Sequence, residues 1–354
     1  MNYINLLLTI SFCICLLAVS CSTNPARSEV ATNEQTSSIA ATPTPPSQHL
    51  PAECAASASV RLGADMFLVG SDEDNILRMY AASDFKFIKD FPLGPTFKLP
   101  DDKIPTIKDK PKTDLEGAAW LSDAVFWVGS HSTSNEGEEK PDRKRIFAHE
   151  IKYTEQGLSL VRIGQPYANL VQDLNNDPQY KNYNLPEAAK KKAKEEGGLS
   201  IEGLAAGKNN SLLIGFRNPV VKGKALIATL VNPREVLENT TAKPKFDKPI
   251  ELDLGGYGIR DITRSNERNS YLIIAGPFSA EKATFRLYEW NGDAGNNPKE
   301  IQTDQLKDLN PEAIIVFPPL NPNSSNRLLI LNDDEKDPKC AANGFRSVWI
   351  DLPN

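Results

Sequence analysis

The sequence has few of the residue patterns that identify common enzymes. Of its 354 residues, only three are histidine and five are cysteine. It contains no Gly-x-Ser-x-Gly elbow, no phosphate-binding P-loop and no His-Glu-x-x-His pair, which excludes the better-known hydrolases and metalloproteases. It also lacks a stripe of basic residues, and its formal net charge is −6. Because clustered Lys and Arg neutralise phosphate backbones, we expect no nucleic acid partner.

The N-terminus has no apolar run long enough for a comfortable transmembrane helix. Residues 6–19 are apolar, which is the length of a signal-peptide core. Small residues then precede Cys21, and this ending resembles a bacterial lipobox, in which the cysteine is lipidated and becomes the first mature residue. No Lys or Arg precedes the run, so a plain secretory signal is the alternative. We expect residues 1–20 to be a lipoprotein signal peptide. Ser22 stands where Asp would favour the inner membrane, so we expect a lipid anchor in the cell envelope, at the outer membrane or cell surface.

The five cysteines separate by position. Cys13 and Cys15 lie inside the signal peptide and are removed with it, and Cys21 is the lipidation site. Cys54 and Cys340 remain, one at each end of the folded domain, and in an oxidising compartment we expect them to pair. No metal cluster or catalytic thiol is indicated near them.

Composition divides the mature chain into a linker and a domain. Residues 21–52 are rich in Ser, Thr, Ala and Pro and contain too few large apolar residues to pack. We expect a disordered linker there, followed by a domain over residues 53–354. At this length, one large all-β domain or two smaller ones are the alternatives.

A short phrase, an acidic residue just before an apolar run, recurs along the domain. Its copies begin at residues 114, 200, 258 and 310, and further short strand-like segments follow each copy. Four strands in each unit of roughly 40 to 60 residues are typical of a propeller. We therefore predict an all-β fold, a β-propeller of five four-stranded blades, or of six if residues 99–113 contain further strands. A pair of β-sandwiches is the alternative, but it does not explain why the phrase recurs.

One insertion, over residues 165–198, separates the second unit from the third. Within it, residues 186–195 begin with Pro and are followed by Gly197 and Gly198, which predicts a helix that could act as a lid. The last unit lacks one strand. We expect the segment after Cys54 to supply this strand and close the ring.

The repeated phrase also predicts where the functional residues gather. The first strand of each propeller blade lines the central channel, so the acidic residues would surround one mouth, together with the loops after the second strands. Crowded carboxylates favour a cation, and oxygen-only ligands favour Ca²⁺. Arginines beside such a metal would suit a phosphate or carboxylate ligand. The candidates are Glu116, Glu202, Asp261 and Glu312 for metal, Arg217 and Arg260 for the ligand, and His131 for acid–base catalysis.

Each candidate also has a structural interpretation. Glu116 and Glu202 would instead accept backbone hydrogen bonds from the neighbouring blade, and so hold adjacent blades together. Gly117 and Gly203 would allow close backbone packing or a β-bulge. His131 also fits a solvated loop. The remaining alternatives are a salt bridge for Arg217 and ordinary polar turns for Asp72, Asp333 and Asp334.

These phrases resemble those of the DUF3616 family, bacterial secreted propellers of uncharacterised function. The resemblance covers residues 57–352. It rests on Leu-Glu-Gly-Ala at 115–118, Ile-Glu-Gly-Leu-Ala at 201–205, Gly-Phe-Arg-Asn-Pro at 215–219, Gly-Ile-Arg-Asp-Ile at 258–262 and Pro-Glu-Ala at 311–313. The Glu-Gly phrases are also similar to those of phytase-like and esterase-like propellers, which implies a Ca²⁺-lined channel and phosphoester hydrolysis. The chain departs from these in lacking a dense Lys/Arg cluster for inositol phosphates, and in having Arg260-Asp261 in place of Glu-Gly.

Two functions follow from these expectations. The first is a monomeric, lipid-anchored binding module whose acidic mouth holds a small molecule or a protein. The second is a Ca²⁺-dependent phosphoester or ester hydrolase, in which the three glutamates hold metal, the two arginines hold the anion and His131 transfers protons. We favour the binding module because the sequence contains no complete catalytic set.

Overall fold

A computed structural model of the chain describes residues 39–40, 48–51, 53–94, 112–155, 157–279, 284–319 and 325–352. All of them belong to one compact unit, Ser37–Asn354. The expectations for residues 1–20, for Cys21 and for most of the 21–52 linker and the 99–113 loop lie outside the described residues. No helix in the described ranges is long and apolar enough to cross a membrane.

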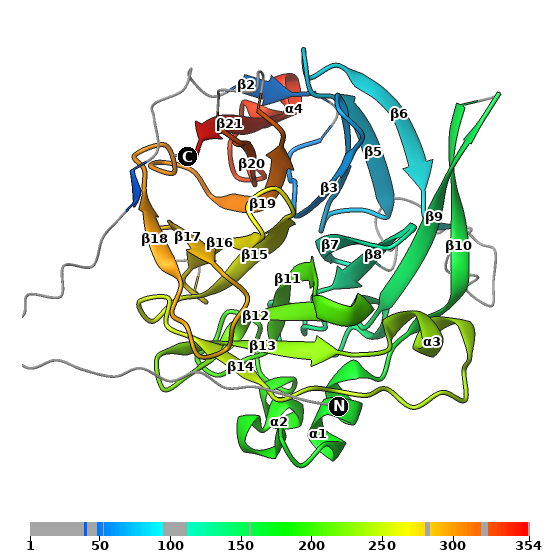
Figure 1. Cartoon of the computed structure of the whole chain (residues 1–354), viewed down its shortest axis with the longest axis vertical. Coiled ribbons are helices and arrows are strands. Elements are labelled where there is room, and N and C mark those ends of the chain that lie inside the picture. The colour runs from blue at the N-terminus through cyan, green and yellow to red at the C-terminus, as the bar shows by residue number, and fades with distance from the viewer. Residues whose placement is uncertain are drawn as a thin grey trace, which may run out of the picture. The chain divides into compact units, whose positions relative to one another are not determined.

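Five sheets, each built on four antiparallel strands, stand around one axis, which confirms the predicted five-bladed β-propeller (Figure 1). In the first three blades the chain runs from the innermost strand to the outermost. Blade 1 contains β3 (Ala58–Leu62), β4 (Met66–Gly70), β5 (Ile76–Ala81) and β6 (Phe87–Pro92). Blade 2 contains β7 (Leu115–Leu121), β8 (Ala124–Gly129), β9 (Ile146–Thr154) and β10 (Gly157–Tyr167). Blade 3 contains β11 (Ser200–Ala206), β12 (Leu212–Val221), β13 (Lys224–Leu230) and β14 (Ile250–Leu252).

The last two blades also use strands from near the N-terminus. Blade 4 contains β15 (Gly258–Ser265), β16 (Ser270–Gly276), β17 (Arg286–Trp290) and β18 (Lys299–Gln302), and β1 (Ile39–Ala40) adds to it in parallel. Blade 5 contains β19 (Pro311–Phe317), β20 (Arg327–Asn332), β21 (Phe345–Asp351) and, outermost, β2 (Gln48–Leu50).

The strand that closes the ring comes from a different segment than expected. It is β2, which precedes Cys54 and lies within the range expected to be a linker, whereas the residues after Cys54 form the inner strand of blade 1. Leu50 pairs with Phe345 and is fully buried. One buried leucine in a three-residue strand is too weak a pattern to distinguish from the surrounding polar sequence.

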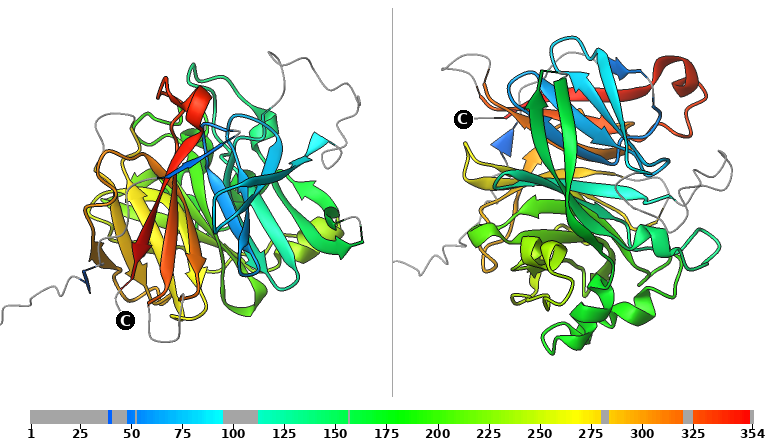
Figure 2. Two further views of the ribbon diagram at one scale, coloured as in Figure 1. Left: turned by 90° about the horizontal axis from the view of Figure 1, so that it is seen from above. Right: turned by 90° about the vertical axis from the view of Figure 1, so that its right-hand side faces the viewer.

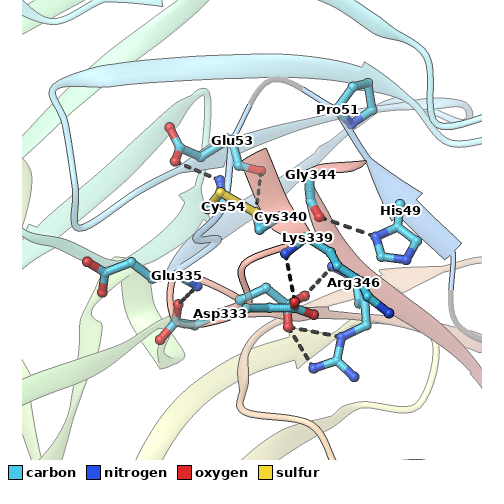
Figure 3. Close-up of a disulfide and its surroundings, with 12 residues drawn as sticks. His49, Pro51, Glu53, Cys54, Asp333, Glu335, Lys339, Cys340, Gly344 and Arg346 are labelled. Carbon is cyan, nitrogen blue, oxygen red and sulfur yellow. Dashed lines mark hydrogen bonds and ion pairs between the residues drawn. A yellow bond between two sulfur atoms is a disulfide. The ribbon is translucent and has the colours of Figure 1, made fainter. Parts of the chain in front are cut away.

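The predicted disulfide between Cys54 and Cys340 is confirmed, and it joins the first and last blades (Figure 3). Backbone hydrogen bonds support the same junction. The Phe345 amide donates to the Glu53 carbonyl at 3.0 Å, and the Asp334 amide donates to the Cys54 carbonyl at 2.8 Å. The bridge therefore fixes the point at which the ring closes.

Apolar side chains fill the space between neighbouring blades. Five buried clusters are present, one at each blade-to-blade interface, including the interface between blades 5 and 1. Their largest members include Trp127 between blades 1 and 2, Trp290 between blades 3 and 4, and Phe345 at the closing interface. This continuous series of interfaces excludes the β-sandwich alternative.

The predicted helix over residues 186–195 is wrong, because α2 ends at Ala188. Beyond it, backbone carbonyls accept hydrogen bonds from side chains elsewhere in the chain, and that of Lys191 is one that a helix over 186–195 would pair with the Glu195 amide. Asn218 Nδ2 donates to the carbonyls of Ala193 (2.9 Å) and Glu195 (2.7 Å), and Thr133 Oγ1 donates to that of Lys191 (2.8 Å). Tertiary hydrogen bonds have thus overridden the local helix propensity.

The short helices lie at the ends and edges of the blades, and α1 and α2 are seen at the rim of the ring (Figures 1 and 2). Leu170, Leu174 and Leu185 of the insertion pack into the cluster between blades 2 and 3. The helical segments are η2 (Pro141–Arg143), α1 (Leu170–Asn176), η3 (Lys181–Tyr183), α2 (Leu185–Ala188), η4 (Lys208–Asn210), α3 (Pro233–Glu238) and α4 (Cys340–Asn343).

Candidate functional site

The inner strands of four blades contain a β-bulge at the same place. In each, one residue is left out of the pairing with the second strand: Glu116 in β7, Glu202 in β11, Arg260 in β15 and Glu312 in β19. The inner strand of blade 1 pairs without such a shift. A bulge redirects a side chain from the regular alternation of a strand. In blade 4 the residue at the bulge, equivalent to the three glutamates, is therefore Arg260. Asp261, which was expected at this position, follows it by one residue.

Asp261 holds two blades together. Its side chain is 5% exposed. Its Oδ1 accepts the Ile262 amide at 2.8 Å, and its Oδ2 accepts the amide of Ile314 in the next blade at 2.6 Å. Asp261 does not line the channel cavity. Its expected place in the metal set is thus corrected, and it has the blade-joining role considered for Glu116 and Glu202.

Gly117 and Gly203, which follow the bulges of blades 2 and 3, occupy the position that Asp261 has in blade 4. This position faces the inner strand of the next blade. A Cβ atom at Gly117 would lie 2.9 Å from the Leu204 amide nitrogen, and one at Gly203 would lie 2.8 Å from Ile262 Cγ2. Both glycines therefore allow the close approach of neighbouring inner strands, as their sequence context indicated. In blade 4 the same position carries Asp261.

A cavity of about 660 Å³ opens at the mouth of the channel. Ten Asp and Glu side chains and seven Lys and Arg side chains line it. Most come from the bulges and from the loops that follow the second strands. Lys112 and Asp114 precede β7, Arg217 and Arg346 lie on β12 and β21, and Lys194 comes from the end of the insertion. Glu116, Glu202, Glu312, Arg217 and Arg260 all reach this cavity.

On one side of the cavity the charges pair with one another. Arg217 Nη1 donates to Glu202 Oε1 at 2.7 Å, and Arg260 Nη1 lies 3.0 Å from Glu202 Oε2. Arg260 also donates to Glu312 through Nη2. Burial opposes ionisation of Glu202, but Arg217 and Arg260 outweigh it and lower its pKa. Burial and the nearby Arg217 lower the pKa of Arg260 to about 10, which leaves it charged at neutral pH.

Arg217 also anchors the adjacent loop. Its Nε donates to the Pro277 carbonyl at 3.1 Å, and its Nη2 donates to the Ser279 carbonyl at 3.4 Å. All three of its nitrogens therefore bind oxygens of the protein. This is the salt-bridge role considered for Arg217, and it uses three of the five N–H donors of the guanidinium.

A second group of carboxylates in the cavity contains Asp72, Asp114 and Glu116. Asp72 follows β4, Asp114 immediately precedes β7 and Glu116 is the bulge residue of β7. Each offers a carboxylate oxygen within 4.8 Å of the other two. Burial, and then the negative charges of Glu202 and Asp114, raise the pKa of Glu116 well above its usual range. Burial, and then Asp114 and Asp333, raise the pKa of Asp72 to about 7.

The hydrogen bonds of this acidic cluster leave several oxygens unused. Asp72 Oδ1 accepts from Ser57 at 3.1 Å, and Asp114 Oδ2 accepts from Ser130 and lies 3.0 Å from Arg143 Nη1. No hydrogen bond or ion pair joins Glu116 to any residue in the described ranges, although its side chain is only 9% exposed. Asp72 Oδ2, Asp114 Oδ1 and both oxygens of Glu116 thus have no donor within the part of the chain that the structure describes.

Two members of this cluster, Asp72 and Asp114, were not among the residues expected to hold metal, although the sequence contained a signal for each. Asp114 opens the first copy of the repeated phrase, two residues before Glu116, and Asp72 stands in a loop after a second strand. A carboxylate two residues before another on a regular strand would lie on the same face. The bulge at Glu116 could not be inferred from this spacing.

His131 is not at the cavity. It is 1% exposed and absent from the cavity lining, and burial lowers its pKa to about 3. Its backbone turns with φ 55° directly after β8. His131 is therefore a neutral, buried residue at physiological pH, which contradicts the solvated-loop interpretation and places the residue away from the cavity.

Comparisons with known proteins bear on the family and add no function. A family model described as "Protein of unknown function (DUF3616)" matches residues 139–343. No curated protein matches the chain.

Three solved structures have similar folds with low scores. Virginiamycin B lyase from Staphylococcus aureus is 10% identical, with 87% of this chain and 99% of that chain covered and a TM-score of 0.36. A GH43 β-1,3-galactosidase with galactodeoxynojirimycin is 11% identical, with 88% and 94% covered and a TM-score of 0.44. A bifunctional GH43-CE protein from Bacteroides eggerthii is 9% identical, with 90% and 34% covered and a TM-score of 0.46. These TM-scores are too low to carry an argument about function.

Proposed function

Since the chain belongs to DUF3616, a family of proteins of unknown function, we propose a function from its own channel mouth: a binding module that holds a small polar ligand there. The observation that carries the proposal is the unequal pairing of charge inside the cavity. Glu202 is neutralised by Arg217 and Arg260, whereas Glu116 has no hydrogen-bond or ion-pair partner among the described residues. A buried carboxylate in this state favours a ligand that brings positive charge or hydrogen-bond donors.

The paired side of the cavity supports a ligand with donor groups over an anion. Arg217 and Arg260 already donate to Glu202, Glu312 and backbone carbonyls. Such a network holds the wall of a site rigid. Because these arginine groups already bind protein oxygens, the groups that remain for a ligand are carboxylate oxygens, which accept hydrogen bonds. We therefore favour an amine or a polyhydroxylated molecule over a phosphoester.

The proposed cellular setting rests on the N-terminal sequence. Lipidation at Cys21 would tether a monomeric propeller to the envelope, with its cavity available to ligands or proteins outside the cytoplasm. The test is metabolic labelling with a radioactive fatty acid. Label is expected in the membrane fraction of the wild-type protein and absent from Cys21→Ala. Equal labelling of the two would contradict the anchor.

A hydrolase is the second candidate, and one observation favours it. Glu116, whose pKa is raised, and Glu202, whose pKa is lowered, line the same cavity. One protonated and one ionised carboxyl group are the components of acid–base catalysis on esters and related bonds. His131 does not contribute, because it lies outside the cavity.

One set of measurements separates these candidates. The full-length chain in detergent would be titrated, in EDTA, with amines, amino acids, polyols and phosphoesters, and its melting temperature followed. We expect a class of amines or polyols to raise the melting temperature, and Glu116→Gln to weaken binding by about tenfold or more. The control is Glu267→Gln, which changes a carboxylate away from this mouth. Turnover of chromogenic esters that Glu116→Gln abolishes would instead establish the hydrolase. Binding that is equal in Glu116→Gln and wild type would contradict the proposed site.

A further inference from the structure

The acidic cluster of Asp72, Asp114 and Glu116 has the dimensions of a site for a single cation. Its three carboxylate oxygens lie within 4.8 Å of one another. Ca²⁺ binds oxygen at about 2.3–2.6 Å, so two oxygens on opposite sides of the ion lie up to about 5.2 Å apart. We propose that Asp72, Asp114 and Glu116 form a binding site for one Ca²⁺ ion at the mouth of the channel.

Glu116 is the observation that distinguishes this site from an ordinary group of surface acids. Its side chain is nine-tenths buried and lines the cavity, and no residue in the described ranges donates a hydrogen bond to it. Arg260 attracts Glu116 electrostatically but makes no hydrogen bond or ion pair with it, and burying a carboxylate without a donor is costly in free energy. A cation at the cluster would offset that cost, and it would also offset the repulsion among the three carboxylates.

The same contacts explain why the other predicted ligands are not part of this site. Glu202 and Glu312 are occupied by the arginines, and both oxygens of Asp261 accept backbone amides. Of the four carboxylates expected to hold metal, only Glu116 remains available. Asp72 and Asp114 complete the set from neighbouring loops.

The positive charges near the cluster leave room for the ion. Arg143 contacts Asp114 through Oδ2, which leaves Oδ1 free of described donors, and Lys112 pairs with Glu73. Arg260 attracts Glu116 from a distance, but its ion pairs are with Glu202 and Glu312. Ca²⁺ takes about six to eight oxygen ligands. Three would come from the chain, and the open cavity gives water or an oxygen-rich ligand access to the others.

The direct test is calorimetric titration of the full-length protein, freed of metal with EDTA and dialysed, with CaCl₂. We expect one equivalent of Ca²⁺ to bind and raise the melting temperature. Glu116→Gln and Asp72→Asn should each weaken the affinity by about tenfold or more. The matched control is Glu335→Gln, which changes an exposed carboxylate of the same cavity outside the cluster and should leave the affinity unchanged. Absence of binding at millimolar Ca²⁺, or an equal affinity in Glu116→Gln, would overturn the proposal.

A measurement in EDTA separates ligand loss from misfolding. Without metal, Glu116→Gln replaces a buried carboxyl group that has no described donor with a neutral amide of similar size, so its melting temperature should equal or exceed that of the wild type. A lower value would show that Glu116 is structural and would count against the site.

The Ca²⁺ site does not depend on an organic ligand, and the two proposals fail separately. Ligand binding that persists in EDTA with no Ca²⁺ binding would refute only the ion. Ca²⁺ binding with no ligand from the panel would leave the ion and refute only the binding module.

Discussion

Arg260 stands at the bulge of blade 4 where Glu202 stands at the bulge of blade 3, and its Nη1 lies 3.0 Å from Glu202 Oε2. On its other side Arg260 pairs with Glu312, the bulge residue of blade 5. One copy of a repeated acidic position has thus become the cation that neutralises its neighbours. The ring of carboxylates expected from the sequence is therefore divided into a neutralised side and an acidic side.

The first prediction tests this division. Arg260→Met should destabilise the protein by about 3–5 kcal/mol, because it leaves Glu202 and Glu312 buried with less compensation. Urea denaturation followed by tryptophan fluorescence would measure the change. The control is Arg286→Met, which removes a partly exposed arginine whose contacts with Glu300 (3.5 Å), Tyr288 and the Tyr257 ring lie near the surface, and it should cost about 1 kcal/mol or less. Equal effects would contradict a central role for Arg260.

The second prediction concerns the joint between blades 4 and 5. Asp261→Ala leaves the buried amide of Ile314 without its acceptor, so a loss of about 1–3 kcal/mol is expected. Hydrogen exchange would report the site of the change, since the Ile314 amide should lose protection before other amides of β19. Asp304→Ala, at an exposed position, is the control. A stability indistinguishable from the control would mean that Asp261 does not hold the blades together.

The third prediction is an acid sensitivity that arises from buried histidine. Burial lowers the pKa of His131 to about 3, whereas an unfolded histidine titrates near about 6.5. Between about pH 3 and about pH 6.5, the unfolded chain therefore binds a proton at His131 that the folded chain does not. Stability is fully present above about pH 6.5 and falls as pH falls toward about 3, by up to about 1.4 kcal/mol per pH unit.

His131→Asn should remove the part of the pH dependence of stability that His131 causes. Asn accepts the positive φ at this position, so the turn can be kept. Urea denaturation at about pH 6.5 and about pH 4 would measure it. Some slope should remain, because burial also lowers the pKa of His149 to about 4. An unchanged slope in His131→Asn, relative to the exposed control His49→Asn, would refute the assignment.

The sequence was sufficient to predict the repeats, the all-β propeller and the disulfide, because each depends on patterns that recur or on residues that have few alternatives. It was also sufficient to place the bulge glutamates and the loops after the second strands at one mouth. It was not sufficient to distinguish Arg260 from Asp261 as the member of the ring. A bulge shifts the facing of a strand by one residue, and nothing in the local composition marks it.

Two further errors have the same kind of cause. The segment after Ala188 has helix-forming residues, but Asn218 and Thr133 bind its carbonyls from elsewhere in the chain. His131 follows a strand in a polar run, yet its turn buries it. Long-range contacts decided both outcomes, and a local sequence window does not contain them.

The last prediction concerns the closure of the ring. The bridge between Cys54 and Cys340 links residues separated by 286 positions, and constraining so long a loop in the unfolded chain is worth about 2–5 kcal/mol. Cys54→Ser with Cys340→Ser should lower the free energy of unfolding by that amount. Cys21→Ser, which removes a cysteine outside the bridge, should have no such effect.

The location of the loss is more specific than its size. Three residues, Gln48–Leu50, close blade 5 through their pairing with β21, and they lie close to the bridge in the chain. Without the bridge, the amides of this strand should exchange with solvent faster, while those of the inner strands β7 and β11 stay protected. Unchanged exchange in Gln48–Leu50 would show that the strand is held by its own pairing and by the burial of Leu50. Uniformly faster exchange in every blade would show that the bridge acts on global stability, with no special effect at the closure.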